Sequence, residues 1–551
     1  MNISKLIIKK LLNDRVKTPA DLAKIKREMA KKYKISCLSN VELLKEYHKL
    51  LKEKRIKKSP ILEKILTKRP IRTLSGVAVI TVLTKPYRCP GRCIYCPEEK
   101  LFPKSYLSGE PAAQRAKNLN FNPYPQVKTR LESLKAQGHP IDKIELIVLG
   151  GTFSYYPRKY QEWFVKECFK ACNGFKNKRG QTSQDYPKNK RFDLKNIQRK
   201  NEKAKCRIVG LTIETRPDLI TEEEAIWLRK LGVTKVELGA QILDDKILKF
   251  NQRGHGIKEI TEATKILKDA GFKVSYHLML NLPGSNIKKD LASFKMAFKN
   301  PHLKPDWLKI YPCVVCKGSK LYALWKQGKY KPYTNKQLIE VLVKIKSQIL
   351  PYWVRVGRLF RDIPVPKIEA GCKISNLREV VQGEMNKRGL KCKCIRCREI
   401  KNLEFRIKNL ELRRREYEAS KGKEIFLSFE DTKNDKVIAF LRLRIPSQNK
   451  PRTKDCGTVR GKHFIPALQD AAIIRELHTY GLLHPINYGS PTSIISPQHR
   501  GLGKKLIKEA EKITRDEFKL NKVAVISGVG VREYYRKLGY KLKNDYMIKK
   551  C

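Results

Sequence analysis

Between Gly76 and about residue 320, short runs of aliphatic and β-branched residues alternate with amphipathic segments of helical period. The β-rich runs cover residues 77–83, 144–150, 207–213, 235–241, 273–280 and 308–314. Helical stretches such as 222–232 and 259–271 separate them. Strand–helix–strand repetition indicates parallel strands joined by right-handed crossovers. About six such units predict an α/β fold built on a partial or full (β/α) barrel, whose reactive groups lie on loops at the C-terminal ends of the strands.

The rest of the 551-residue chain divides around this barrel, since the length exceeds what one core needs. Residues 1–75 read as basic helices, with Val41, Leu44, Tyr47 and Leu51 on one face. Residues 76–320 form the barrel, and 321–415 a linker that is helical and mixed. Residues 416–551 carry new strand patterns and a glycine turn that opens a helix, which predicts a separate α+β domain. Residues 448–467 look like an insertion in it.

The charge of the chain is strongly positive, with 119 Lys and Arg against 54 Asp and Glu, a formal net charge of +65. A lysine-rich composition accounts for part of this excess but not for local clusters. Residues 1–75 hold 22 basic and 7 acidic side chains, and 176–206, which we expect to be a surface loop, hold 11 and 3. Such a field attracts the phosphates of nucleic acid. It disfavours a basic protein as substrate.

The N-terminal sequence and the short length of the apolar runs predict a soluble, cytoplasmic protein that does not associate with a membrane. No run approaches the roughly 18 apolar residues of a membrane helix, and the N-terminus lacks a secretory cleavage pattern. The 15 cysteines are therefore not expected to form disulfides. Two tight groups predict metal ligation instead.

The first cysteine group, Cys89, Cys93 and Cys96, follows the first barrel strand with C-x3-C-x2-C spacing. Soft thiolates select iron–sulfur clusters or zinc. Three thiolates on a four-iron cluster would leave one iron open for a substrate or cofactor. A zinc site with a remote fourth ligand is the alternative. Gly150 and Gly151 end the second strand, where they form a tight turn or contact a cofactor.

The second group, Cys392, Cys394 and Cys397, has spacing typical of structural zinc. Cys372, Cys456 and His463 are candidates for the fourth ligand. Unligated cysteines are the alternative, and we expect no catalytic role here.

The C-terminal domain holds a second candidate site at Gln498-His-Arg-Gly501-Leu-Gly503-Lys504, where glycines open a helix. Exposed N–H groups and the helix dipole there suit a pyrophosphate. Downstream, Tyr534 and Tyr535 are candidates for donating a proton to a thiolate leaving group, and one of the two is expected to pack in the core.

These motifs together resemble a known family. The first cysteine loop and Gly150-Gly151-Thr152-Phe153 resemble the radical S-adenosylmethionine (SAM) superfamily, and the C-terminal motifs resemble the GNAT acetyltransferases. Their pairing resembles the catalytic subunit of Elongator, a tRNA-modifying family. The resemblance is carried by residues 138–153, 211–218, 235–241, 474–481, 499–503 and 524–540. It implies a radical SAM partial (β/α) barrel followed by an α+β GNAT domain, with a basic helical tRNA-binding region at residues 1–75.

The resemblance also implies ligands and residues. The cofactors are a [4Fe–4S] cluster on Cys89, Cys93 and Cys96, S-adenosyl-L-methionine, and acetyl-CoA as co-substrate. The implied acetyl-CoA contacts are Lys143, Glu476, Leu477, His478, Thr479, Leu502, Gly503, Lys504 and Tyr535. The implied activity is tRNA uridine(34) carboxymethyl or acetyl transfer, in which a SAM-derived radical takes hydrogen from the acetyl methyl group and the carbon adds to C5 of the wobble uridine. The partner is the tRNA anticodon region, and a homodimer is an assembly to test.

Departures from the family pattern leave alternatives open. The cysteine gap is shorter than is usual in the family, and His277-Leu-Met-Leu-Asn281 lacks the family's proline. A protein lysine acetyltransferase with a structural barrel is one alternative. A non-enzymatic tRNA-binding module with structural zinc is the other.

Overall fold

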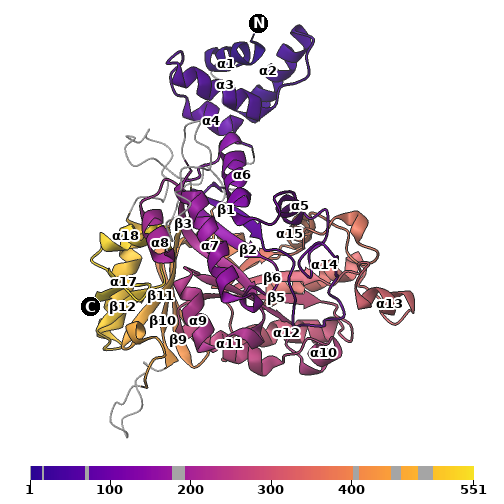
Figure 1. The fold of residues 1–551 in the computed structure, drawn as a ribbon, viewed down its shortest axis with the longest axis vertical. Coiled ribbons are helices and arrows are strands. Elements are labelled where there is room, and N and C mark those ends of the chain that lie inside the picture. The colour runs from indigo at the N-terminus through magenta and orange to yellow at the C-terminus, as the bar shows by residue number, and fades with distance from the viewer. Residues whose placement is uncertain are drawn as a thin grey trace.

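The computed structural model describes residues 2–14, 16, 18–68, 73–175, 193–400, 409–447, 461–481 and 501–551. Three bodies follow one another along the chain: a helical bundle, a parallel sheet covered by helices, and a mixed sheet (Figure 1). The bundle projects beyond α6 (Pro123–Ala136), while the two sheets form the bulk of the molecule.

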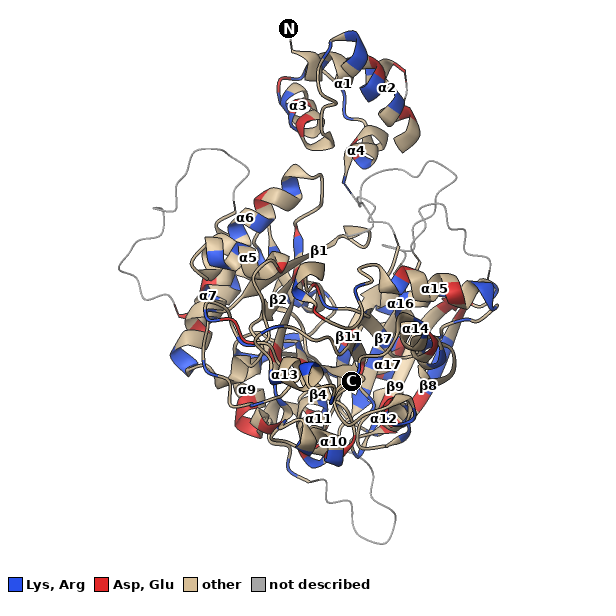
Figure 2. Cartoon of the chain, turned by 90° about the vertical axis from the view of Figure 1, so that its right-hand side faces the viewer, with Lys and Arg blue, Asp and Glu red and all other residues tan. Residues whose placement is uncertain are grey.

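The N-terminal bundle consists of α1 (Ile3–Asn13), α2 (Pro19–Lys32), α3 (Asn40–Lys52) and α4 (Pro60–Leu66). Hydroxyl side chains cap three of them: Thr18 and Ser39 form capping boxes with Asp21 and Glu42, and Ser59 caps α4. The buried face of α3 differs slightly from the predicted one. It consists of Leu43, Leu44, Tyr47 and Leu50. The bundle has a core of its own. Basic segments lie along α2 and α6 (Figure 2).

Within the described residues, the central sheet has seven parallel strands in chain order, from β1 to β7. Its strands are β1 (Val77–Leu83), β2 (Lys143–Leu149), β3 (Arg207–Thr215), β4 (Lys235–Gln241), β5 (Lys273–Leu280), β6 (Trp307–Pro312) and β7 (Arg355–Arg358). The helices between these strands along the chain are α5 (Pro111–Asn118), α6 (Pro123–Ala136), α7 (Arg158–Asn173), α8 (Leu194–Glu202), α9 (Glu222–Lys230), α10 (Asp245–Phe250), α11 (Ile257–Asp269), α12 (Ile287–Lys299), α13 (Lys320–Lys326) and α14 (Asn335–Lys344). β1 and β7 are not paired, so the barrel is partial.

Two segments differ from the sequence expectation. Residues 321–415 were expected to be a linker, yet they supply β7, α15 (Leu377–Lys387) and α16 (Ile395–Arg398). β7 has only four residues, one of them glycine, so its apolar pattern is too short to recognise. In the basic segment 176–206, expected to be a loop, residues 194–202 form α8 and bury Leu194 and Ile197. Residues 176–192 lie outside the described part.

The mixed sheet begins at β8 (Leu410–Ala419), six residues before the predicted boundary. It continues with β9 (Gly422–Asp431), β10 (Lys436–Ile445), β11 (Ala471–Thr479), β12 (Lys522–Val525), β13 (Lys541–Lys543) and β14 (Tyr546–Lys550). The order is β13-β14-β12-β11-β10-β9-β8, and only the β11–β12 pairing is parallel. Two helices accompany it, α17 (Leu502–Asp516) and α18 (Arg532–Arg536).

A buried ion-pair network joins the two sheets into one body. Arg475 on β11 donates to both carboxylate oxygens of Asp306, at 2.6 and 2.8 Å, and to Glu424 at 2.8 Å. Lys268 lies 3.4 Å from the same two carboxylates. All four side chains are at most 1% exposed. Asp306 precedes β6, so the mixed sheet packs against the N-terminal ends of the barrel strands. Among the described residues, no helix combines the length and apolarity needed to cross a bilayer.

Candidate functional site

A cavity of about 220 Å³ opens at the C-terminal ends of the barrel strands, and Cys89, Cys93 and Cys96 line it. The loop that carries them follows β1, as the sequence predicted. Residues from the ends of β2 to β7 complete the wall. The sulfur atoms of these three cysteines do not all lie within 4.8 Å of one another.

Two guanidinium groups lie beside the cysteine loop. Arg253 donates to the Cys93 sulfur at 3.4 Å and to the Gly239 carbonyl at 2.6 Å. Arg216 packs against Gly91, and its buried Nη1 has no hydrogen-bond partner among the described residues. Although burial alone would raise the pKa of Cys93, the charge and hydrogen bond of Arg253 hold that pKa below its usual value. Arg253 therefore favours the thiolate form of Cys93.

The glycine turn after β2 is fixed by its backbone. Gly150 has a φ of 142°, and a Cβ there would lie 1.8 Å from the Thr84 hydroxyl oxygen, so no other residue fits. Gly151 has a φ of 84°. The following Thr152 hydroxyl lies 3.6 Å from the Cys89 sulfur. Gly150 and Gly151 both line the cavity, so the predicted glycine motif and the cysteine loop form one site.

The floor of the cavity carries a charged network that the sequence did not predict. Lys309 on β6 pairs with Glu237 on β4 and, at 3.3 Å, with Glu214 on β3. His277 lies 3.0 Å from Glu237, and the Tyr106 hydroxyl donates to Glu214 at 2.6 Å. Burial alone would raise the pKa of Glu237, but the ammonium groups of Lys309 and Lys235 hold it well below its usual value. The sequence signal that could have revealed this network is the presence of charged residues inside otherwise apolar strands.

The second candidate site lies on the mixed sheet, where β11 extends past its neighbour. The β11–β12 ladder covers Ala471 to Ile474 on β11, so Glu476, Leu477, His478 and Thr479 lie beyond the end of β12. α17 begins beside them at Leu502, after its N-cap Gly501, whose φ of 77° favours glycine. A Cβ on Gly503 would contact the Leu477 side chain at 3.8 Å and the Tyr534 hydroxyl at 3.3 Å. The structure thus brings the predicted strand, helix start and tyrosine together. Gln498, His499 and Arg500 lie outside the described residues.

The two tyrosines of α18 have different environments. The Tyr534 side chain is 37% exposed and places its hydroxyl near the start of α17, while Tyr535 is 6% exposed and packs in the core of the mixed sheet. Their rings are 5.2 Å apart, edge to face. Burial raises the pKa of Tyr535, so its phenol stays protonated at neutral pH. The carboxylate of Glu476 is held by Arg442 at 2.8 Å and Lys273 at 3.7 Å, so Glu476 can offer a ligand only its backbone.

The two candidate sites lie at opposite ends of the barrel strands, and charged side chains lie between them. Lys143 starts β2, on the side of the mixed sheet, where its register partner Arg207 contacts Gly530. Lys235 lies 3.3 Å from Glu145 and 3.5 Å from Glu237, which reaches the cluster cavity. These charged side chains thus form a row through the barrel interior.

Comparisons with known proteins identify the family. Residues 83–296 match the model of the Radical SAM superfamily, and residues 305–387 match that of the Radical_SAM C-terminal domain. The chain is 46% identical over 501 residues to a tRNA uridine(34) acetyltransferase of Methanocaldococcus jannaschii, covering 89% of this chain and 87% of that one. It is 37% identical over 549 residues to human Elongator complex protein 3, covering 96% and 93%. The chain belongs to the Elongator complex protein 3 family.

A solved structure of the same family supports this family assignment. The archaeal Methanocaldococcus infernus Elp3 with an N-terminal deletion matches with a TM-score of 0.71 and 43% identity, covering 87% of this chain and all of that one. Radical SAM membership implies a [4Fe–4S] cluster and SAM. The three-cysteine donor set, the two guanidinium groups and the glycine turn fit both groups.

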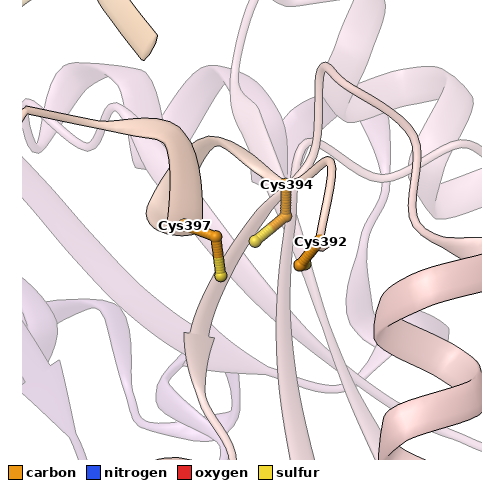
Figure 3. Close-up of side chains that lie close together, drawn as sticks. All are labelled: Cys392, Cys394 and Cys397. Carbon is orange, nitrogen blue, oxygen red and sulfur yellow. The ribbon is translucent and has the colours of Figure 1, made fainter. Parts of the chain in front are cut away.

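The second cysteine group of this family member is more compact. Cys392 and Cys394 lie on the loop before α16 and Cys397 on α16, with sulfur atoms within 4.8 Å of one another (Figure 3). The Lys346 ammonium lies 3.2 Å from the Cys397 sulfur. No fourth His, Cys, Asp or Glu of the described ranges joins the three.

Two of the three predicted fourth ligands, His463 and Cys372, do not join this group. His463 is a wrong candidate, because one ring nitrogen accepts from the Ile465 amide at 2.9 Å and the other lies 3.2 Å from the Asp269 carbonyl oxygen. Cys372 is buried in the barrel core. Cys456 falls outside the described residues.

Proposed function

We propose that the protein is a tRNA uridine(34) carboxymethyl or acetyl transferase that uses SAM-derived radical chemistry on acetyl-CoA. One observation carries the proposal: the cavity lined by Cys89, Cys93 and Cys96 and the exposed end of β11 beside the start of α17 lie on two sheets that the buried Arg475–Asp306 network joins. Family relatives named for tRNA uridine(34) acetylation support the substrate.

The cavity residues would hold the cofactors. Cys89, Cys93 and Cys96 would bind a [4Fe–4S] cluster, and Gly150 and Gly151 would contact SAM through their backbone. When bound, these groups supply one-electron chemistry that activates C–H bonds. Arg253 and Arg216 would offset the thiolate charge, and the enclosing strands would keep water from reactive species.

The C-terminal site would hold acetyl-CoA. The α17 N-terminus, with Leu502, Gly503 and Lys504, would bind the pyrophosphate through backbone N–H groups and the helix dipole. The part of β11 beyond β12, Glu476 to Thr479, would pair with the pantetheine amides. Lys143 would contact the coenzyme from the barrel side, as the family resemblance implies. The family resemblance implies Tyr535 as the proton donor to the departing thiolate, and Tyr534, whose hydroxyl lies near the start of α17, is the alternative.

Transfer RNA would contact the basic surfaces. The α1–α4 bundle carries most of the basic excess of residues 1–75, and its lysines lie outside its core. Phosphate contacts of this kind make affinity strongly dependent on salt. They would position the anticodon while the cavity receives the wobble base.

The test of this proposal is nucleoside mass spectrometry of tRNA from cells that lack the protein. We expect the carboxymethyl-type derivatives at C5 of the wobble uridine to disappear and to return with the wild-type gene. An unchanged nucleoside profile in the deletion strain would contradict the proposal.

The tyrosine assignment can be tested with Tyr535→Phe, which keeps the ring and its packing. If Tyr535 is the proton donor, turnover of acetyl-CoA falls by roughly 10²-fold, the lower range for general acid catalysis. Tyr534→Phe is the matched control, expected to change the KM for acetyl-CoA more than kcat. Unchanged kcat in Tyr535→Phe together with a loss in Tyr534→Phe would transfer the role to Tyr534.

The second cysteine group is proposed to bind one structural zinc ion. Elemental analysis of protein purified without chelators should find about one zinc per chain, and Cys394→Ser should remove it. The Ile395 amide donates to the Val354 carbonyl, and Glu399 pairs with Arg355 of β7, which also donates to the Tyr480 hydroxyl. Because these contacts adjoin the cysteine group, we also expect a lower melting temperature. Equal zinc content in the wild type and the Cys394 variant would exclude this site.

A further inference from the structure

A ladder of aromatic rings runs from the protein surface to the mouth of the cluster cavity. Tyr87 stacks on Tyr156 with ring centroids 4.8 Å apart, and Tyr156 stacks on Tyr160 at 4.9 Å. Tyr155 lies beside Tyr87, 6.2 Å away and tilted by 54°. Tyr87 and Tyr156 line the cavity. Tyr87 and Tyr155 are 39% and 40% exposed, so these two rings present aromatic surface to solvent where the cavity opens.

The ladder is held rigidly against the glycine turn. The Tyr156 hydroxyl donates to the Lys85 carbonyl at 2.6 Å and lies 2.9 Å from the Thr84 hydroxyl, the group that packs against Gly150. The Tyr160 hydroxyl accepts from the Lys85 amide at 3.1 Å. These bonds do not involve the Tyr87 hydroxyl. Tyr87 therefore rests on a support that survives its removal, and its ring is free to serve a ligand.

Basic side chains accompany the rings. The Lys85 ammonium lies 5.1 Å from the Tyr160 ring centroid, and Arg88 lines the cavity next to Tyr87. Aromatic rings interleaved with cations are the arrangement that binds single-stranded nucleic acid, since every base has a π-face and every nucleotide a phosphate. A peptide or lipid partner would not need the cations, and the net charge of +65 favours a polyanion.

We propose that Tyr87 and Tyr155 form a stacking platform for an unpaired RNA base next to the base that enters the cavity. The inference rests on the proposed function and names how that site recognises its substrate. A base on the platform would keep the strand unstacked and would aim the adjacent nucleotide at the cluster. Enzymes that act on a base must first remove it from its stack, and aromatic contacts to neighbouring nucleotides offset that cost.

The experiment uses the full-length protein and an anticodon stem-loop RNA with 2-aminopurine next to the wobble uridine. Binding to the wild type should quench the fluorophore by stacking. Tyr87→Ala and Tyr155→Ala should each weaken RNA binding by roughly 5- to 150-fold, the range for one base–aromatic stack, and Tyr87→Ala should abolish the quench. Tyr87→Phe, which keeps the ring, should restore both. Phe250→Ala, which removes an aromatic ring 57% exposed on α10 and outside the cavity lining, is the control.

Each contrary outcome has a distinct meaning. Equal RNA affinity and quench in the wild type and both alanine variants would overturn the platform while leaving the proposed function intact. A weaker SAM affinity of Tyr87→Ala, measured without RNA, would assign the ring to the cofactor and also overturn it. A wild type that binds the RNA but forms no modified uridine after cluster reconstitution would instead contradict the proposed function.

Discussion

Cys96→Ser is expected to remove the iron–sulfur absorption and to reduce wobble-uridine modification to background, while tRNA affinity stays within about twofold of the wild type. Burial and the neighbouring Cys93 raise the pKa of the Cys96 thiol to about 12, so without a metal the group is a protonated thiol. Coordination is what makes it a thiolate. Serine keeps the size of the side chain but supplies a poor ligand for iron.

The control for this variant is Cys37→Ser, since Cys37 is an exposed cysteine of the N-terminal bundle. It should keep full iron content and activity. Iron and sulfide analysis after anaerobic reconstitution measures the first effect and nucleoside analysis the second. Zinc without iron in the reconstituted wild type would refute the radical assignment. Loss of tRNA binding in Cys96→Ser, with modification of free nucleoside retained, would refute the separation of binding from chemistry.

Asp306→Ala is expected to lower the free energy of unfolding by about 3–5 kcal/mol, the range for removing one partner of a buried ion pair. The change leaves the guanidinium of Arg475 and the ammonium of Lys268 facing one carboxylate, Glu424. It also removes the acceptor of the Val274 amide, 2.9 Å away at the start of β5. Because this network joins the two sheets, acetyl-CoA turnover and uridine modification should fall together.

Chemical denaturation followed by circular dichroism measures this effect. Asp516→Ala is the matched control: Asp516 pairs with Arg515 at the surface, where both side chains are about half exposed. An exposed pair contributes 1 kcal/mol or less. If Asp306→Ala destabilises the protein no more than Asp516→Ala does, the Asp306 network does not hold the sheets together.

The regular parts of the fold were predictable because their signals are local. β1, β4 and β5 have the predicted ranges, since each is a short run with several apolar, β-branched or aromatic residues between helical segments. β7 was missed because four residues of mixed character carry no periodic signal. α8 was not predicted because its basic and polar residues resemble a surface loop, although its buried face contains Leu194 and Ile197.

The candidate sites divide in the same way. The cysteine spacings and the glycine turns are short patterns with a chemical reason, and the structure places each group at the expected strand end or loop. Lys309, Glu214, Arg253 and the Tyr87 ladder act through contacts between segments as far as 160 positions apart, which one sequence does not show. The wrong prediction of His463 as a zinc ligand has the same cause. Its ring nitrogens contact Ile465 and Asp269, and the contact with Asp269 forms only in the folded chain.

The most direct test of the account follows the methyl hydrogens of acetyl-CoA into tRNA. Reconstituted protein would be given SAM, a reductant, tRNA and acetyl-CoA with a fully deuterated methyl group, and the wobble nucleoside would be analysed by mass spectrometry. The account predicts a carboxymethyl group at C5 that keeps two deuterium atoms, and none in Cys96→Ser. A product that keeps all three deuterium atoms, or equal product from wild type and Cys96→Ser, would contradict radical activation of the acetyl group.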